Sequence, residues 1–433
     1  MLRSIIARSQ PLLSHLRWRA AAAPGAAKPR ILPLRAYATD DDTARPNGAD
    51  GRTAAAESNL RRHLYVVLKE RRSVTHSIYK LDVDDLHDGE HATVADEAPR
   101  RLPGRALRLG ASLVGTYNDT HFDAVGSNIV MTTHSSTLSV LFAGTPYFLT
   151  LVYDTKTGKL DGGRPPHELP PGPFDSEPDG DVLEAREWFP SHPYQSAPVG
   201  DKLWALNGEE ENTPGYLAYE EPDEEWAWKM CRRPLPLDAG GGRSRVMSHA
   251  VHPDGRTVFA SSSFTFSLDT RRCRSARRGD WRLPFHGRGH YDGELGAWVG
   301  IREADGTDGG VKGSPYLCSC DVPDLAGVDV EGPVPAPAWR MCDQELTFLK
   351  TPVNLGCRAL VHVGHGRFCL VEVVPAASVA EGAEARGGEC LLHVTVFRAE
   401  HCKNGELVVT PCRPGRSYLV PNCSLCLPGA FWI

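Results

Sequence analysis

Residues 250–269 read AVHPDGRTVFASSSFTFSLD, and this stretch decides the fold. Pro253-Asp254-Gly255 signals a tight turn, because proline presets the backbone, aspartate caps turn amides and glycine tolerates a positive φ. Two short runs follow it, Thr257–Ser261 and Thr265–Leu268, in which valine, phenylalanine and threonine dominate. Pro253-Asp254-Gly255 lies between two strand runs, so residues 252–257 are predicted to form a hairpin turn, and the second of the runs that follow closes on Leu268-Asp269.

Similar short runs recur from Arg62 to the end of the chain, separated by glycine, proline and aspartate. Few windows keep a 3.6-residue hydrophobic period for more than two turns, so the pattern favours strands over helices. We predict an all-β protein. The other clear runs are His63–Leu68, Ser77–Leu81, Ile129–Thr132, Tyr147–Tyr153, Leu203–Leu206, Tyr216–Tyr219, Ala297–Ile301, Tyr316–Cys320, Ala359–Val363, Phe368–Val374, Leu391–Phe397 and Glu406–Thr410.

A weak internal repeat runs through these strands. Its unit is a strand, a turn, and a second strand that closes on an apolar residue and an acid, often followed by a tryptophan. The closings are Leu81-Asp82, Tyr153-Asp154, Tyr219-Glu220, Leu268-Asp269 and Cys320-Asp321, with a degenerate sixth at Phe397-Arg398, and the tryptophans are Trp226/Trp228, Trp281 and Trp339.

The repeat has a physical consequence for the fold. One four-stranded sheet cannot bury both of its faces, so neighbouring sheets must stack around an axis. In that arrangement the aspartate caps the turn after the third strand, and the tryptophan starts the outer strand and fills the gap between sheets. We predict a six-bladed β-propeller over residues 61–433. A two-sheet sandwich with a second domain is the alternative.

The N-terminal segment is compositionally distinct. Residues 1–37 contain six arginines, one lysine and no acid, and their apolar residues recur at helical spacing, as in a mitochondrial presequence. Arg35-Ala36-Tyr37-Ala38 predicts cleavage after Tyr37. A chloroplast transit peptide is the alternative. Residues 38–60 are small, polar and acidic, which predicts a disordered linker.

Charge and hydropathy restrict the partners. The formal net charge is −6, and it is more negative once the basic leader is set apart, which argues against a nucleic-acid partner. No apolar run approaches the roughly 20 residues of a membrane-spanning helix, so we expect no membrane insertion. The 12 cysteines are sparse for a disulfide scaffold, and we expect them to be reduced and mostly in the core.

Several stretches together resemble a known family. They are Arg62–Leu68 with Ser77–Leu81, Ala250–Thr257, Trp281–Gly300, Leu317–Asp321, Pro337–Trp339 and Ala430–Trp432. They resemble a plant family, expanded in grasses, of uncharacterised kelch-like proteins that carry the domain of unknown function 1618 or a close relative. The resemblance covers residues 60–433. It implies a propeller that binds protein, and it carries over no catalytic residue.

His286, His290 and Asp292, with Glu294 after them, form the most suggestive polar group. Imidazole and carboxylate suit zinc or manganese. We favour a glycine-rich loop between strands, made flexible by Gly287 and Gly289, whose histidine bonds to the backbone. We therefore assign no metal ligand, catalytic residue or cofactor.

The other cysteines and histidines of note are better explained by structure. Cys423 and Cys426 form a single CxxC without the second pair that zinc requires. Cys318 and Cys320 face the same side of one strand, which fits core packing. We interpret His362, His365 and His393 as partnered core or turn residues.

Two charged runs are candidate contact surfaces. Arg271–Arg278 contains five arginines, and Glu209–Glu225 is rich in acids. We expect the first to be a solvated loop, with contact to an acidic partner or a nucleic acid as the alternative. The second is either a partner surface or a hydrated loop.

We therefore carry three hypotheses of function. The first is a non-catalytic mitochondrial scaffold whose loops bind a protein partner, since a rigid ring presents variable loops. The second is an enzyme or metal-binding protein with a site at the channel mouth. The third, an adaptor for ubiquitin ligation, is the weakest, because residues 38–60 offer no F-box helix.

Overall fold

Short antiparallel strands make up nearly all the regular structure of this computed structural model. It describes residues 62–71, 75–82, 99–110, 119–135, 147–164, 195–206, 214–221, 224–231, 233, 235–237, 246–303, 315–325, 332–345, 358–376, 389–412, 415–421, 423–424 and 427–433. The predicted presequence, residues 1–37, and the predicted linker, residues 38–60, lie outside them.

The strands form six antiparallel sets in the part of the chain that is described. Set 1 is β26 (Gly429–Trp432), β1 (Leu64–Lys69), β2 (His76–Leu81) and β4 (Arg105–Leu109). Set 2 is β5 (Asp119–Val125), β6 (Asn128–Ser135), β7 (Tyr147–Asp154) and β8 (Leu160–Arg164). Set 3 is β9 (Ser196–Val199), β10 (Lys202–Ala205), β11 (Gly215–Glu220) and β12 (Glu225–Met230).

The remaining sets follow in chain order. Set 4 is β13 (Ser248–Val251), β14 (Thr257–Ser261), β15 (Thr265–Asp269) and β16 (Arg274–Gly279). Set 5 is β17 (His286–Asp292), β18 (Ala297–Glu303), β19 (Pro315–Asp321) and β20 (Trp339–Glu345). Set 6 is β21 (Arg358–Gly364), β22 (Arg367–Pro375) and β23 (Cys390–His401), with β24 (Leu407–Pro411) and β25 (Arg416–Val420) on β23 and β3 (Arg100–Arg101) beyond β25.

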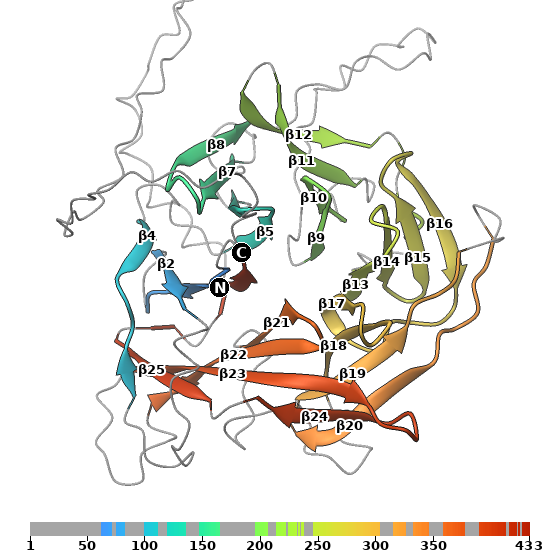
Figure 1. Ribbon diagram of the computed structural model, residues 1–433. Helices are drawn as coiled ribbons and strands as arrows, with labels where there is room; N and C mark the ends of the chain where they lie inside the picture. Colours follow the sequence, from blue (N-terminus) through green and yellow to red (C-terminus); the bar gives the residue numbers. More distant parts are fainter. Residues whose placement is uncertain are drawn as a thin grey trace, which may run out of the picture. The chain divides into compact units, whose positions relative to one another are not determined.

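The first strands of the sets meet around one axis. Strand β26 contacts β5, β5 contacts β9, β9 contacts β13, β13 pairs with β17, β17 contacts β21, and β21 contacts β26 again. The other strands of each set extend outward from this circle (Figure 1). Sheets arranged radially around a central axis define a β-propeller, as the repeat predicts.

The hydrophobic core is divided among the gaps between neighbouring sets. One apolar cluster packs Val130 and Val152 of set 2 against Leu203 and Trp228 of set 3. Five further clusters join the other neighbouring sets in the same way. Because both faces are covered, middle strands such as β14 are buried throughout. Each fully buried large side chain contributes about 1.5–3 kcal/mol.

The first and last strands of the propeller along the chain, β1 and β26, pair with each other in set 1. Strand β26 pairs antiparallel with β1, with Leu64 opposite Trp432. The His63 N–H donates to the Ile433 carbonyl at 2.7 Å, and the Ile433 N–H donates back at 3.1 Å. The last strand along the chain therefore completes the sheet that the first strand begins.

The predicted repeat corresponds to the third strands. Leu81, Tyr153-Asp154, Tyr219-Glu220, Leu268-Asp269 and Cys320-Asp321 all lie at the ends of β2, β7, β11, β15 and β19. The degenerate sixth, Phe397-Arg398, lies inside β23, which continues to His401. The hairpin expected at 252–257 is present, with the His252 N–H bonded to the Thr257 carbonyl at 2.7 Å and Gly255 at φ 67°.

Two of the tryptophan predictions need correction. Trp226 and Trp228 lie in the outer strand β12 and are buried, as expected. Trp339 does begin an outer strand, but it is 45% exposed beneath the Arg302 guanidinium and does not fill a gap. Trp281 follows the outer strand β16 and does not begin it, but it does pack against the cluster between sets 4 and 5. Its indole N–H bonds to the Val334 carbonyl at 2.9 Å.

Candidate functional site

Four inner strands carry polar side chains toward one another at the centre of the ring. They are Asp123 on β5, Ser196 on β9, His249 on β13 and Arg288 on β17, which we call the central cluster. β13 and β17 are parallel neighbours that place His249 beside Arg288. The cluster is thus assembled from four different sets.

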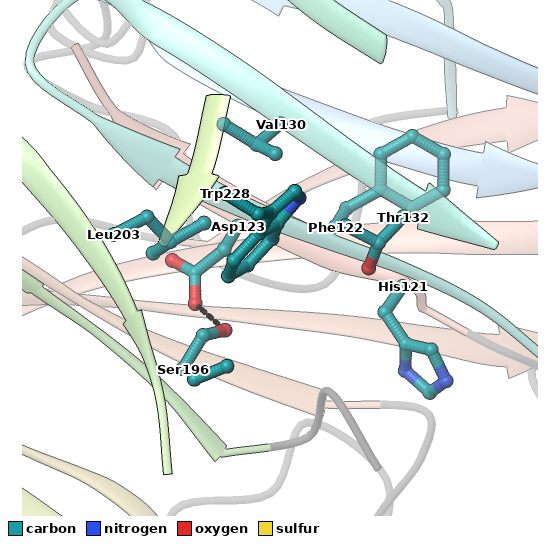
Figure 2. A pocket seen from close by; sticks show the side chains of 9 residues that line it. His121, Phe122, Asp123, Val130, Thr132, Ser196, Leu203 and Trp228 are labelled. Carbon is teal, nitrogen blue, oxygen red and sulfur yellow. Dashed lines mark hydrogen bonds between the residues drawn. The ribbon is translucent and has the colours of Figure 1, made fainter. Parts of the chain in front are cut away.

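Asp123 is the hub of the central cluster. Its carboxylate accepts a hydrogen bond from the Ser196 hydroxyl (Figure 2). It also accepts one from the Ala124 N–H at 2.7 Å. Arg288 lies 3.8 Å away from the same carboxylate. Burial raises the pKa of Asp123, while Arg288 and Ser196 oppose that rise. Sets 2 and 5 are three steps apart in the circle, so this ion pair links two opposite sets across the centre of the ring.

His249 is the unpartnered member. It is 2% exposed, and neither ring nitrogen has a hydrogen-bond partner with good geometry. Burial and the Arg288 charge lower its pKa to about 3, with the Ser196 backbone opposing. The imidazole is therefore neutral near pH 7, and the cluster offers no cationic histidine to a reaction.

The predicted group His286, His290, Asp292 and Glu294 does not converge on one point. His286 is exposed, and the Nε2 of His290 lies 3.0 Å from the Leu360 carbonyl of set 6. Glu294 pairs with Arg398 at 3.0 Å. Among the residues described, no group of three or more His, Cys, Asp or Glu side chains is arranged to hold a metal ion.

Asp292 fastens set 5 to set 6. Its carboxylate accepts from the Leu295 N–H at 2.9 Å, the Gly366 N–H at 2.8 Å and the His362 ring at 2.8 Å. Burial raises the pKa of Asp292, but these hydrogen bonds outweigh it and leave the pKa below its usual value. The residue holds two sheets together and has no free edge for a ligand.

The glycines of this stretch are not flexible linkers, which corrects our prediction of a loop. Residues 286–292 form β17, the innermost strand of set 5. A Cβ on Gly289 would lie 2.3 Å from the ring of Phe285, and one on Gly300 would lie 2.5 Å from it. The absent side chain at Gly289 therefore makes room for a buried phenylalanine ring.

The three other histidines are partnered, as predicted. His362 bonds to Asp292, and His393 bonds through Nδ1 to the Ser417 hydroxyl at 2.9 Å. Burial lowers the pKa of His393 to about 4. His365 sits in a turn with φ 54° and lies 3.4 Å from Glu294.

The prediction that the cysteines lie mostly in the core is confirmed for the described residues. Cys318 and Cys320 are fully buried, and burial raises the pKa of each to about 12. Cys423 is buried, whereas Cys426 lies outside the described residues. All described cysteines are free thiols.

The basic run is only partly a solvated loop. Residues 274–279 form β16, and Arg278 is buried, bonding to the Ser267 hydroxyl and the Gly332 carbonyl at 2.7 Å each. Arg271, Arg272 and Arg274 are exposed. The described part of the acidic run is likewise structured, since Gly215–Glu220 is strand β11 and Glu220 pairs with Lys229.

A small pocket lies between sets 2 and 3, next to Asp123. Its walls include His121 and Thr132 on one side and Ser196, Leu203 and Trp228 on the other (Figure 2). The Trp228 indole N–H bonds to the Thr150 hydroxyl at 2.9 Å across the same gap. The Asp123 carboxylate, the Ser196 hydroxyl and the Trp228 indole N–H are thus tied into contacts between the sheets.

Sequence reasoning missed Asp123, Ser196 and His249 as site residues and singled out only the stretch that contains Arg288. Asp123 lies on β5 and Arg288 lies on β17. These two strands are far apart in the sequence, so no local sequence pattern predicts that the two side chains pair. Separately, no described residues form a helix long and apolar enough to cross a membrane.

The fold and its centre define a β-propeller in which an aspartate–arginine pair joins two opposite sets. The chain belongs to the family described as "Protein of unknown function (DUF1668)", whose model matches residues 61–418. The family number thus differs from the 1618 that the resemblance suggested. No curated protein matches the chain.

Solved structures give distant likenesses. A putative 6-phosphogluconolactonase from Bacteroides uniformis is 10% identical, covering 86% of this chain and 99% of its own, with a TM-score of 0.37. The Cps50 (Swd1) β-propeller domain of Myceliophteria thermophila is 10% identical over 81% and 87%, with a TM-score of 0.36. The WD40 domain of SCAP from fission yeast is 9% identical over 83% and 74%, with a TM-score of 0.29. The propeller assignment here rests on the sheet topology.

Proposed function

We propose that this protein is a non-catalytic, six-bladed propeller that acts as a protein-interaction scaffold in the mitochondrion. Each of the six strand sets is one blade in this proposal. Asp123, Ser196 and Arg288 at the centre are engaged with one another and support the ring, while binding takes place on exposed turns. We also propose that the chain is of plant origin and kelch-like, following the resemblance of residues 60–433.

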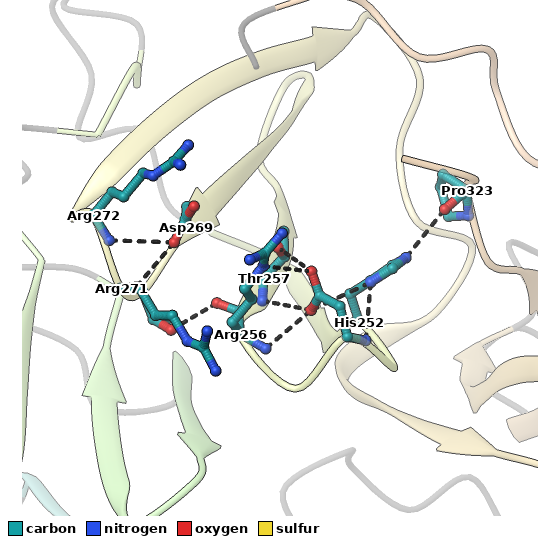
Figure 3. Close-up of polar contacts among 9 residues, drawn as sticks. His252, Arg256, Thr257, Asp269, Arg271, Arg272 and Pro323 are labelled. Carbon is teal, nitrogen blue, oxygen red and sulfur yellow. Dashed lines mark hydrogen bonds and ion pairs between the residues drawn. The ribbon is translucent and has the colours of Figure 1, made fainter. Parts of the chain in front are cut away.

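One observation carries the scaffold proposal: two turns of set 4 are built as a rigid basic surface. Asp254 accepts from the Arg256 and Thr257 N–H groups at 2.9 Å each. Asp269 accepts from the Arg271 N–H at 2.9 Å and the Arg272 N–H at 3.2 Å (Figure 3). Both turns are therefore capped by their own aspartates.

The two turns are also fastened to each other and to the next set. The Thr270 N–H and hydroxyl both bond to the Arg256 carbonyl, at 3.0 and 2.6 Å. The His252 ring lies 3.2 Å from the Pro323 carbonyl, beyond β19 (Figure 3). The exposed side chains of Arg256, Arg271 and Arg272 thus stand on a fixed base, which we call the arginine turn pair.

The chemistry of the arginine turn pair selects an acidic protein segment. Guanidinium groups bind carboxylates with two parallel hydrogen bonds, and a fixed backbone reduces the entropy lost on binding. The rest of the chain is acidic, which repels nucleic-acid backbones but leaves a local basic edge that steers a carboxylate-rich peptide. In this proposal the scaffold recognises its partner at that edge.

Charge reversal tests the proposal. The full chain and the Arg271→Glu/Arg272→Glu variant are used to capture partners from mitochondria, with Lys403→Glu, another exposed cation, as the matched control. We expect a partner recovered by the wild type and the control and lost by the double variant. Equal recovery by all three proteins would remove the arginine turn pair from the proposed function.

The proposed mitochondrial localisation is tested separately. In the proposal, residues 1–37 direct import and are removed after Tyr37, so a fluorescent fusion of the full chain enters mitochondria and the imported protein begins at Ala38. The fusion without residues 1–37 stays outside. Delivery to chloroplasts is the alternative result, and it would overturn the mitochondrial assignment.

A further inference from the structure

Two cysteines from neighbouring sets meet beneath the arginine turn pair. Cys231 directly follows β12 of set 3, and Cys273 lies in the turn between β15 and β16 of set 4. Their thiols are in hydrogen-bonding contact. Both pack into the apolar cluster that joins the two sets. The contact is therefore built into an interface between sheets.

The two thiols have different access to solvent. Cys231 is 2% exposed, and its N–H is held by the Pro214 carbonyl at 2.9 Å. Cys273 is half-buried and occupies a left-handed turn position, φ 48°, between exposed Arg272 and Arg274. A small oxidant can therefore reach the Cys273 thiol from solvent, whereas the buried Cys231 thiol is not directly accessible.

The surroundings also favour a thiolate at the outer position. The hydrogen bond from Cys231 and the nearby Lys202 charge lower the pKa of Cys273 to about 7, against the effect of burial. The same contact and burial raise the pKa of Cys231. An accessible thiolate next to a second thiol is the arrangement of reversible thiol oxidation.

We propose that Cys273 and Cys231 are a peroxide-oxidised pair that forms a disulfide between sets 3 and 4. The Cys273 thiolate attacks one oxygen of hydrogen peroxide, the O–O bond breaks, and hydroxide leaves as Cys273 becomes a sulfenic acid. The Cys231 sulfur then attacks the Cys273 sulfur, the S–O bond breaks, and the Cys231 proton leaves in water. In sum, two thiols and one peroxide give one disulfide and two waters.

The structure supplies an internal comparison. Cys390 and Cys423 also contact each other, but both are 3% exposed inside the cluster between sets 6 and 1. Cys402 and Cys412 are exposed, so their oxidation serves as the control for unselective oxidation at the surface. The proposal therefore predicts selectivity for one pair among the described cysteines. It goes beyond the proposed function and holds whether or not a partner binds the arginine turn pair.

Peptide mapping tests the disulfide directly. The reduced full chain is treated with stoichiometric hydrogen peroxide, blocked with N-ethylmaleimide and cut with chymotrypsin, which separates residues 229–237 from residues 269–281. Each peptide holds one cysteine, Cys231 or Cys273. We expect these two peptides to be linked and Cys390 and Cys423 to remain thiols. Oxidation of Cys402 and Cys412 without that link would overturn the proposal.

Two variants assign the roles of the thiols. In Cys231→Ser, or Cys231→Ala if the serine variant does not fold, Cys273 should stop at a sulfenic acid that dimedone traps. In Cys273→Ser, Cys231 should stay reduced. Alkylation of Cys273 should rise with pH around a midpoint near 7, below the roughly 8.5 of an unperturbed thiol. A midpoint at that ordinary value, or equal oxidation of Cys231 in Cys273→Ser, would refute the assignment.

Discussion

The substitution Gly289→Ala probes the most confined position of β17. The new Cβ would lie 2.3 Å from the Phe285 ring, more than 1 Å inside an ordinary contact. That ring is 2% exposed and is also pressed against Gly300, so it cannot retreat. Overpacking of this kind costs about 3 kcal/mol of unfolding free energy.

A double-mutant cycle separates this clash from a general loss of the strand. Phe285→Ala alone should cost about 3–5 kcal/mol because it leaves a cavity. In Gly289→Ala/Phe285→Ala the methyl group enters that cavity, so the double variant should be about as stable as Phe285→Ala. The coupling energy is then about 3 kcal/mol.

The assay is urea unfolding of the full chain, followed by tryptophan fluorescence and far-UV circular dichroism. Gly293→Ala is the matched control, because its Cβ would meet no atom within 4 Å, and it should change stability by about 0.5 kcal/mol or less. If Gly289→Ala matched this control, or if the two substitutions were additive, the close approach of Phe285 to β17 would be wrong.

Three further outcomes follow from other contacts. Glu372→Gln should cost about 3–5 kcal/mol, because it leaves the Arg358 charge unpaired in a pair whose side chains are each 2% exposed; a urea midpoint unchanged from the wild type would contradict this. Burial lowers the pKa of His393 to about 4, so the unfolded chain, with a pKa of about 6.5, takes up its proton first as the pH falls. His393 alone therefore costs about 3 kcal/mol of stability between pH 6.5 and 4, in addition to the loss from other buried histidines such as His249. His393→Gln should reduce the fall of the urea midpoint over this range, while exposed His365→Gln leaves it unchanged. Removal of residues 429–433 takes away β26 and should abolish the cooperative thermal transition; a sharp transition in the truncated chain would refute closure by this strand.

The two middle strands of each set could be predicted from the sequence, because their residues carry the pattern locally. Every run we predicted overlaps a strand, and the 257–261 strand has the predicted bounds. Leu268 and Asp269 illustrate this local pattern. Leu268 is a buried residue near the end of β15, and the next residue, Asp269, caps the turn that follows. Strand, turn and cap are all short-range choices.

Most of the inner and outermost strands could not be predicted in the same way, although the inner strand β21 overlaps the predicted run Ala359–Val363. β17 reads HGRGHYD, which by local preference is a loop. It becomes a strand because β13 pairs with it on one side and β18 on the other. The central cluster was missed for the same reason: Asp123 and Arg288 approach each other only after the ring has assembled, so no spacing along the chain encodes their contact.

Closure of set 1 by β26 has a consequence for biosynthesis. While the chain is being made, β1 is among the first strands to leave the ribosome, yet the neighbour that covers its inner edge is residues 429–432. An extended edge with unpaired N–H and C=O groups thus stays available throughout translation. Nascent chains of this protein should therefore depend on chaperone protection until residues 429–432 are released.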